Sequence, residues 1–379
     1  MIKKRLPLII SLIDVLIIWG CSQQPKSNIV TLQPTTSDEL YLGTPTEIVQ
    51  LETTEESSLD YIYKTFIDDE NDKIFVLANF NVYTFSRKGK FQSKLKQGNG
   101  PGEINMIVAF CADAKNKRFY ALDMGNTLHI FNYDGEIIET QKITAFPSFD
   151  IYPKDEENVF LYCNYVGRNE KFFVGIYNLQ RKEITQKFIS EEESPYAILT
   201  MGNANNFQKI GDRLFFSSPN IFGLFEAKAD TFRRNITYDL GPKSVPENFY
   251  SPYVNERKRA RFGQACRENG YVPYLLASFY YNQHYISILD DEKGSCFVID
   301  EKDRSKIYMN GQLSDYFNLP KLESLQLPTG IQEKQITFAC SPLEFFDDDI
   351  QEETKLISIA DLNIEIRYDQ NPFLIIATD

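Results

Sequence analysis

The sequence predicts an all-β fold: a six-bladed β-propeller of four-stranded antiparallel blades, in which an N-terminal strand closes the last blade. A short alternating apolar pattern ends on an apolar residue followed by a small polar or acidic one. It recurs five times, at Phe85-Ser86, Phe131-Asn132, Tyr177-Asn178, Phe225-Glu226 and Ile299-Asp300. The spacings of 46, 46, 48 and 74 residues are typical of repeat folds in which each unit contributes one small sheet.

The first two copies of the pattern align strand by strand. The corresponding positions are residues 74–78 with 119–123, residues 82–85 with 128–131, and Gly89 with Gly135. Short strands of alternating polarity, joined by a turn that needs glycine for its positive φ, form a β-hairpin. A further strand precedes each copy, at residues 61–67 and 106–112. Four strands in about 40–50 residues is the period of a propeller blade, and closing the ring covers the sheet edges.

The last blade is assigned from the two ends of the sequence. Leu356, Ile359, Ala360 and Asn363 fit a helical stripe, followed by a strand at residues 372–377, although residues 364–369 also imitate the repeated pattern. Residues 46–51 have no strand before them to pair with, so we expect them to return as the outermost strand of the last blade. The 74-residue spacing indicates an insertion of about residues 240–283 between blades 4 and 5.

The N-terminus has the parts of a secretory signal. Lys3, Lys4 and Arg5 precede an apolar stretch at residues 6–19, which is too short for a membrane span. Cys21 follows Gly20 and resembles the acylated cysteine of the bacterial lipobox; the alternative is an ordinary signal peptide. The predicted organisation is a lipoprotein signal peptide at residues 1–20, a flexible tether at residues 21–44 and the propeller at residues 45–379.

Composition agrees with packed sheets and excludes one class of partner. Aromatic residues make up 14% of the sequence, with 22 Tyr and 29 Phe, whereas a single Trp and five Met argue against a helical bundle. The formal net charge is -13, and such an acidic surface repels nucleic acid and anionic lipid head groups. We expect no nucleic-acid partner, contact with the membrane only through the lipid anchor, and a monomer.

The cysteines indicate no metal or redox site. The five that follow Cys21 are odd in number and lack CxxC spacing, which leaves their disulfide pairing open: Cys111, Cys163, Cys266, Cys296 and Cys340. Three of them, Cys111, Cys296 and Cys340, lie in predicted strands, where a thiol serves as a small buried apolar group.

The two histidines give no catalytic residue. His129 aligns with Tyr83 of the preceding repeat, so we expect it to be a strand residue and not a ligand. His284 opens a strand of blade 5 and is a candidate ligand-binding residue at the mouth of the ring, with a surface histidine as the alternative. Hydrolase and zinc-protease motifs do not occur in the sequence, so no catalytic residue is predicted.

A glycine-rich segment carries a family resemblance. Residues 96–103 include Gly98, Gly100, Pro101, Gly102 and Glu103. The segment resembles the GxGPGE signature of six-bladed β-propeller lipoproteins of Bacteroidetes, which are related in shape to TolB-like and NHL-repeat propellers. Residues 369–376 are similar to the closing Asn-Pro-apolar strand of that family. The resemblance, from about residue 45 to the end, implies the fold and a cell-envelope location, without a settled activity.

The side of the membrane stays open. Residues 22–26 lack the acidic run that is associated with export to the cell surface in those bacteria. We therefore expect a protein anchored in the envelope, at the outer membrane of a Gram-negative bacterium, on either the surface or the periplasmic side.

Two segments offer ligands for phosphate or calcium. The glycine-rich segment lacks the Lys-Ser/Thr pair of a P-loop, so we predict a tight link from blade 1 to blade 2. The acidic residues 68–72 offer several oxygens for calcium, but they align with residues 113–117 at a turn between strands, and we favour a solvated turn. No cofactor or metal site is predicted, with calcium as the alternative.

The insertion is the one basic segment of this acidic chain. The basic residues that gather there are Arg257, Lys258, Arg259, Arg261 and Arg267. The spacing of Val254, Arg257, Lys258, Arg261 and Phe262 suits a short helix with one apolar edge, and such a patch attracts an anionic ligand or an acidic partner. The alternative is a solvated helix face. Four tyrosines flank it and are hypothesised to stack on sugar rings: Tyr250, Tyr253, Tyr271 and Tyr274.

The sequence therefore predicts a lipid-anchored module that binds or scaffolds an unidentified envelope protein or glycan. The candidate ligand-binding residues are Tyr253, Arg257, Lys258, Arg259, Arg261 and His284. The alternative is a propeller enzyme, of the metal-dependent lyase or lactonase type, with its site in the central channel.

Overall fold

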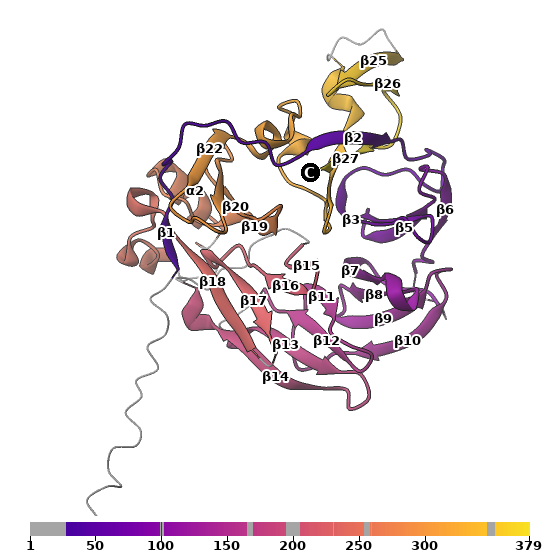
Figure 1. Cartoon of the computed structure of the whole chain (residues 1–379). Coiled ribbons are helices and arrows are strands. Elements are labelled where there is room, and N and C mark those ends of the chain that lie inside the picture. The colour runs from indigo at the N-terminus through magenta and orange to yellow at the C-terminus, as the bar shows by residue number, and fades with distance from the viewer. Residues whose placement is uncertain are drawn as a thin grey trace, which may run out of the picture.

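The chain forms six four-stranded antiparallel blades around one axis (Figure 1), which confirms the predicted fold class. The computed structural model describes residues 28–98, 100, 102–164, 170–194, 205–229, 231–253, 258, 260–346 and 353–379. The signal peptide, Cys21, Arg257, Arg259 and Pro101 lie outside the described residues.

The first three blades follow one another without interruption. Blade 1 contains β3 (Ile62–Asp68), β4 (Lys73–Ala78), β5 (Asn81–Phe85) and β6 (Phe91–Lys94). Blade 2 contains β7 (Ile107–Asp113), β8 (Arg118–Asp123), β9 (Thr127–Asn132) and β10 (Ile137–Lys142). Blade 3 contains β11 (Asp150–Pro153), β12 (Asn158–Tyr162), β13 (Phe172–Asn178) and β14 (Glu183–Ser190).

The last three blades carry the additions to the ring. Blade 4 contains β15 (Phe207–Ile210), β16 (Arg213–Phe216), β17 (Gly223–Lys228) and β18 (Thr231–Asp239), with β1 (Ile29–Thr31) on its outer edge. Blade 5 contains β19 (Leu275–Tyr281), β20 (His284–Leu289), β21 (Cys296–Asp300) and β22 (Ile307–Gly311). Blade 6 contains β23 (Gly330–Ile331), β24 (Gln335–Cys340), β27 (Phe373–Thr378) and β2 (Thr44–Val49).

Helical segments are short and lie between strands. They comprise α2 (Phe262–Glu268) and the 3₁₀ turns η1 (Ala114–Asn116), η2 (Glu191–Glu193), η3 (Gly241–Lys243), η4 (Glu247–Phe249), η5 (Ser251–Tyr253), η6 (Leu313–Phe317), η7 (Glu323–Leu325) and η8 (Pro342–Phe345). Among the described residues, no helix combines the length and the apolar character needed to cross a membrane.

The repeated pattern marks the third strand of blades 1 to 5. Its copies end or lie within β5, β9, β13, β17 and β21. In blade 1 the whole of β5 is buried, and its neighbour β4 is buried except at Lys73. Both faces of a blade are covered by the next blades around the ring, so apolar side chains occur on both sides of these strands. Cys111, Cys296 and Cys340 are buried, as predicted, and burial raises the pKa of the Cys111 thiol to about 12.

The two ends of the sequence close the ring. Strand β2 pairs antiparallel with β27 and places Ile48 opposite Ile375, which confirms the predicted return of the N-terminal segment. On the inner side, the Thr65 backbone N–H donates to the Thr329 carbonyl at 2.8 Å. Gly330 makes this approach possible, because a Cβ there would lie 2.6 Å from Thr65 Oγ1. Blades 6 and 1 are therefore joined at the rim and near the axis.

The helix predicted near the C-terminus is wrong. Residues 354–367 form a hairpin of β25 (Thr354–Ile359) and β26 (Leu362–Arg367), which projects from blade 6 (Figure 1). Buried isoleucines alternate along both strands: Ile357, Ile359, Ile364 and Ile366. This period of two determines the structure, and the helical stripe of exposed Leu356 with Ala360 is coincidental. Residues 364–367 thus belong to β26, residues 368–369 lie in the turn after it, and none of them belongs to the repeat.

The predicted tether and insertion both end earlier than expected. From Asn28 onward the chain packs on the propeller: β1 pairs parallel with β18, and Val30, Leu32 and Leu42 are buried. The part of the tether before Asn28 lies outside the described residues. The insertion covers residues 240–274 and not 240–283, because residues 275–281 form β19, the innermost strand of blade 5. The predicted helix at residues 254–262 is described only in part, and α2 begins at Phe262.

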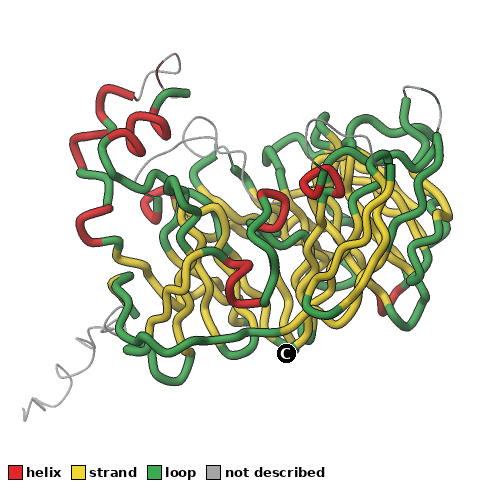
Figure 2. The backbone as a smooth tube through the Cα atoms, turned by 90° about the horizontal axis from the view of Figure 1, so that it is seen from above, coloured by secondary structure: helices red, strands yellow, loops and turns green. Residues whose placement is uncertain are grey.

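The long connections all lie on one face of the ring. The turns between first and second strands, and between third and fourth strands, have two to six residues. The connections on the other side include the longest, residues 240–274 and 341–372. Figure 2 shows the disc edge-on, with the helical turns of the insertion standing on one side and the C-terminus on the other. We call the side with the long connections the loop face.

Asn371 fastens the seam between the chain ends. Its side-chain oxygen accepts the Leu59 backbone N–H at 2.8 Å, and its amide donates to the carbonyls of Glu52 at 3.0 Å and Ser57 at 2.7 Å. The side chain is 2% exposed. This is the asparagine of the Asn-Pro pair noted in the sequence, and it holds residues 52–59, the connection from β2 to blade 1, against the start of β27.

Asn371→Ala is expected to lower the free energy of unfolding by about 2–4 kcal/mol, because the Leu59 N–H and the Ser57 carbonyl, both of buried residues, lose their partner, while the Glu52 carbonyl keeps the Ser57 hydroxyl. Urea unfolding monitored by far-UV circular dichroism measures this free energy. Asn105→Ala, which removes an exposed amide, is the control. Equal stability of the two variants would contradict the role of Asn371 as a clasp.

Candidate binding face

The insertion after blade 4 has a small core of its own. Phe262 and Cys266 of α2 are buried, and six aromatic side chains pack around them: Phe222 from blade 4 and, from the insertion, Phe249, Tyr250, Tyr253, Tyr271 and Tyr274. Gly263 makes room for this packing, since a Cβ there would lie 2.7 Å from the Tyr274 hydroxyl. The four tyrosines that flank the basic patch therefore have a packing role in the insertion, which the hypothesis of sugar stacking did not include.

Two of the predicted basic residues line an open cleft. Lys258 and Arg261 are exposed and border a cleft of about 620 Å³ together with Tyr253, Gln264 and Glu268. The Gln264 side chain donates to Glu268 Oε1 at 2.9 Å along α2. The cleft thus places two cations beside an aromatic ring and one carboxylate, an arrangement that can hold an acidic group.

Ion pairs join the insertion to blade 5. Arg267 Nη1 lies 2.7 Å from Asp290 Oδ2, and Lys243 Nζ lies 3.0 Å from Asp291 Oδ2. Burial raises the pKa of Asp290, against the effect of Arg267. Burial also tends to raise the pKa of Asp291, but the hydrogen bonds from Ser295 and Lys243 have the larger combined effect, and the pKa of Asp291 is lowered. Arg267 and Lys243 therefore anchor the insertion, while Lys258 and Arg261 face the cleft.

His284 lies away from these residues. It begins β20 on the short-turn face, where Nδ1 contacts the Asn282 carbonyl and Nε2 lies 3.9 Å from Asp300 Oδ2. The seven residues of β19 separate it from the insertion, a length of about 20 Å. The structure brings Tyr253, Lys258 and Arg261 together and does not bring His284 to them.

The glycine-rich motif is a closed link between β6 and β7. Glu103 folds back so that Oε2 accepts the Gly100 N–H at 2.7 Å, and a Cβ on Gly98 would lie 2.0 Å from the same oxygen. Gly102 has a φ of +77°. The Ile104 N–H donates to the Lys96 carbonyl at 2.9 Å, which closes the loop. The glycines thus accommodate the glutamate and the turn, in agreement with the predicted link between blades.

A buried ion pair joins the innermost strands of blades 1 and 3. Lys64 of β3 lies 3.2 Å from Asp150 Oδ1 of β11, and the two residues are 8% and 0% exposed. Asp150 Oδ2 also accepts the Asn206 N–H at 2.9 Å. Burial raises the pKa of Asp150, and the charge of Lys64 opposes this. The pair connects blades 1, 3 and 4, and sequence patterns do not reveal it.

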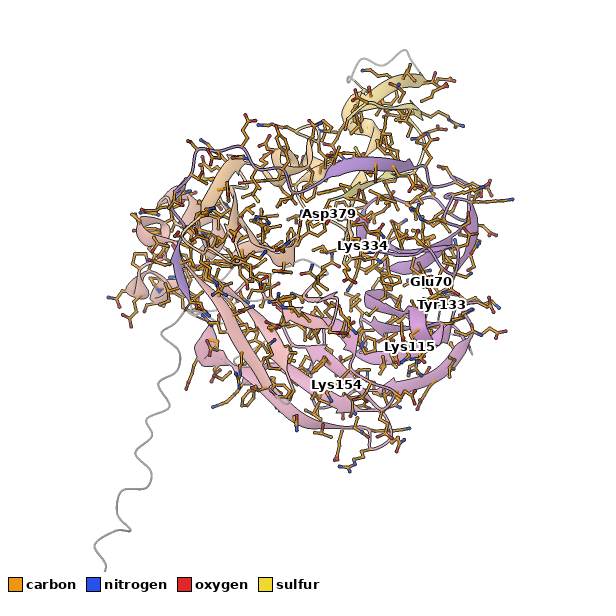
Figure 3. The ribbon with its side chains drawn as sticks, in the orientation of Figure 1. Glu70, Lys115, Tyr133, Lys154, Lys334 and Asp379 are labelled. Atoms are coloured by element: carbon orange, nitrogen blue, oxygen red, sulfur yellow. The ribbon has the colours of Figure 1, made fainter. Side chains whose placement is uncertain are left out.

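The acidic cluster of blade 1 belongs to a turn. Asp68 accepts the Asn71 N–H at 3.1 Å, the Asn71 side chain at 2.9 Å and the Tyr133 hydroxyl at 2.8 Å. Figure 3 shows Glu70, Lys115, Lys154 and Lys334, from the corresponding turns of blades 1, 2, 3 and 6, in an arc around the axis. In the described part of the chain, no three His, Cys, Asp or Glu side chains are grouped as a metal site.

Three exposed aromatic rings gather on the loop face of blade 1, and we call Tyr61, Tyr63 and Phe80 the aromatic cluster. The ring centroids of Tyr61 and Tyr63 are 4.9 Å apart in an edge-to-face arrangement, and those of Tyr63 and Phe80 are 6.0 Å apart. Sequence analysis did not identify them. The sequence does contain one signal: Asn79-Phe80 occupies a two-residue turn whose preferred sequence is Asn-Gly, so a phenylalanine stands where glycine is expected.

Phe80 has an unfavourable backbone conformation. Its φ is +57° and that of Asn79 is +49°, as in a turn with positive φ at both central residues. A residue with a Cβ in this region costs about 1–2 kcal/mol. For a bulky side chain it is an outlier. Strained residues of this kind cluster at functional sites, because selection for stability alone would remove them.

Comparisons with known proteins agree with the architecture. The profile of a family described as "Domain of unknown function (DUF4934)" matches residues 28–378. Among solved structures, the chain is similar to a protein of Bacteroides fragilis described as exported, at 14% identity and a TM-score of 0.71, over 92% of this chain and 99% of that one. It is also similar to a member of the DUF4221 family from Bacteroides vulgatus, at 8% identity and a TM-score of 0.51, over 88% and 97% of the two chains. No curated protein matches.

Lys64→Met and Asp150→Asn are each expected to lower the free energy of unfolding by about 3–5 kcal/mol, because each leaves a buried group without its partner. The double variant should lose less than the sum of the two, with a coupling of about 1–3 kcal/mol. Urea unfolding of the four proteins measures this cycle. Strict additivity would show that the two side chains do not stabilise each other.

Proposed function

This chain belongs to the DUF4934 family, and we propose that it is a lipid-anchored cell-envelope β-propeller that binds a protein or glycan partner through its loop face. The observation that carries the proposal is the asymmetry of the ring. Between the described strands, one face has turns of two to six residues, whereas the other carries the long connections, including a folded insertion with an open cleft. Binding residues of rigid scaffolds are concentrated on such loops.

The insertion supplies the contact region in this proposal. Its aromatic core and its ion pairs to Asp290 and Asp291 fix it on the ring. Arg261 directly precedes α2, so its backbone is in place before a partner binds, and the entropy lost there on binding is mainly that of the side chain. Because the chain as a whole is acidic, Lys258 and Arg261 give a local attraction for a carboxylate or another acidic group of the partner.

The proposed location follows from the N-terminus. A lipobox-like Gly20-Cys21 stands at the end of a signal-like stretch, and the neighbour from Bacteroides fragilis is described as exported. We infer attachment through acylated Cys21 to the outer membrane of a Gram-negative envelope, as in the propeller lipoproteins with TolB-like and NHL-like relatives that the sequence resembles. Both sides of that membrane are compatible with the proposal.

Lys258→Glu together with Arg261→Glu is expected to weaken partner capture about tenfold, because two attractive charges become repulsive. The purified protein is immobilised and exposed to detergent-solubilised envelope, and retained proteins are quantified by mass spectrometry. Lys88→Glu with Lys90→Glu, on an exposed turn of the other face, is the matched control. A set of partners that is the same for both double variants would contradict the insertion as the contact region.

Cys21→Ala is expected to move the protein from the membrane fraction to the soluble fraction, since the acyl chains are the only proposed attachment. Fractionation and the mass of the mature N-terminus measure this. Ser22→Ala is the control and should stay with the membrane. If the Cys21→Ala protein continues to sediment with lipid, the anchor lies elsewhere.

A further inference from the structure

The aromatic cluster is exposed without a packing reason. Tyr61, Tyr63 and Phe80 are 55%, 40% and 42% exposed. Tyr63 is the extra residue of a β-bulge, because Ile62 pairs with Ala78 and Lys64 pairs with Leu77. Bulges redirect side chains and are frequent next to functional sites. A bulge and a positive φ thus place two of the three rings on the loop face.

The cluster is held in place before any ligand arrives. The Asn79 side chain accepts the Asp60 N–H at 3.2 Å and donates to the Ser58 carbonyl at 3.0 Å, which ties the Phe80 turn to the segment that carries Tyr61. The Phe80 carbonyl accepts the Ile107 N–H at 2.7 Å, which ties the same turn to blade 2. Rigid aromatic side chains give contact area at a low entropic cost.

The size of the cluster favours a small ligand over a protein surface. Three rings of 150–250 Å² each, exposed to this extent, present about 300 Å². A stable protein interface buries about 800 Å² on each partner. The cluster matches the area of one or two sugar rings, whose C–H faces stack on aromatic rings while their hydroxyls reach the polar groups around them.

The carboxylates around the aromatic cluster favour a neutral ligand over an acidic one. Asp60 and Glu323 are exposed beside the rings. Burial raises the pKa of Tyr61, and Tyr63 and Glu323 raise it further, so its hydroxyl is a donor at neutral pH. Carboxylates accept hydrogen bonds from sugar hydroxyls and repel acidic sugars.

We propose that Tyr61, Tyr63 and Phe80 form a stacking platform for a neutral carbohydrate. This deepens the proposed function, because it names a ligand class for the loop face on which that function rests. Glycine at position 80 would relieve the backbone strain but would also remove the aromatic ring. In this proposal the strained phenylalanine is retained because its ring binds the ligand.

The probes are neutral hexasaccharides of β-1,4-glucose, α-1,4-glucose, β-1,4-mannose and β-1,4-xylose, titrated into the purified protein by calorimetry, with oligogalacturonate as the acidic comparison. We expect at least one neutral probe to bind, and oligogalacturonate to bind at least tenfold more weakly. Absence of binding by all four neutral probes at millimolar concentration would overturn the proposal, as would equal binding of the acidic one.

The variants separate binding from folding. Phe80→Gly and Tyr63→Ala are expected to weaken binding at least tenfold, whereas Tyr61→Phe, which keeps the ring, loses no more than threefold. Phe80→Gly should keep the thermal midpoint within about 2 °C of the unmodified protein, since glycine suits the positive φ. Tyr41→Ala, which removes a 60% exposed ring elsewhere, is the control and should bind normally.

The outcomes distinguish this proposal from the preceding one. Undiminished sugar binding by Phe80→Gly would place the sugar elsewhere and overturn the platform. A second result would also overturn the platform: the unmodified protein binds no sugar, and Phe80→Gly loses a protein partner. The cluster would then belong to a protein interface. Neither result depends on Lys258 and Arg261, so the role of the insertion is tested separately.

Discussion

The structure depends on the seam between blade 6 and blade 1. A blade is apolar on both faces and is stable only when a neighbour covers each of them. At the seam, one continuous core joins Val49 and Leu51 of the N-terminal segment with Leu374 of the C-terminal strand and Ile62 of blade 1. If β2 left β27, the unpaired edge of β27 and the apolar face of blade 1 would both be exposed to water.

The seam also explains why one face is free for binding. Strand β2 starts on the short-turn face, and β27 ends there, because Thr44 pairs with Thr378. The chain before β2 runs along the outer edges of blades 4 and 5, where β1 pairs with β18 and the Thr35 N–H donates to the Ile307 carbonyl. The β2–β27 pairing thus holds the ends of the chain at the rim, and the connections of the loop face can lengthen without disturbing closure.

Local periodicity in the sequence predicts individual strands, but it does not predict contacts between residues that are far apart in the sequence. The third strands and the closing strand follow from alternation and from an unpaired segment. At the β25–β26 hairpin, Ile359 fits both the helical period and the period of two, so local periodicity predicts a helix where the structure has strands. The Lys64–Asp150 pair joins residues 86 positions apart, and the packing of residues 28–43 relies on edges of blades 4 and 5 that local sequence cannot place. The basic residues of the insertion were found, but their distance from His284 required the topology.

The two candidate sites lie on different parts of the same face. The aromatic cluster lies on blade 1. The cleft belongs to the insertion between blades 4 and 5, which lies on the opposite side of the ring (Figure 1). A ligand that touched both would have to span the region above the Lys64–Asp150 pair. Their chemistry also differs, because one offers apolar rings beside carboxylates and the other offers two cations. Different ligands are therefore expected at the two sites.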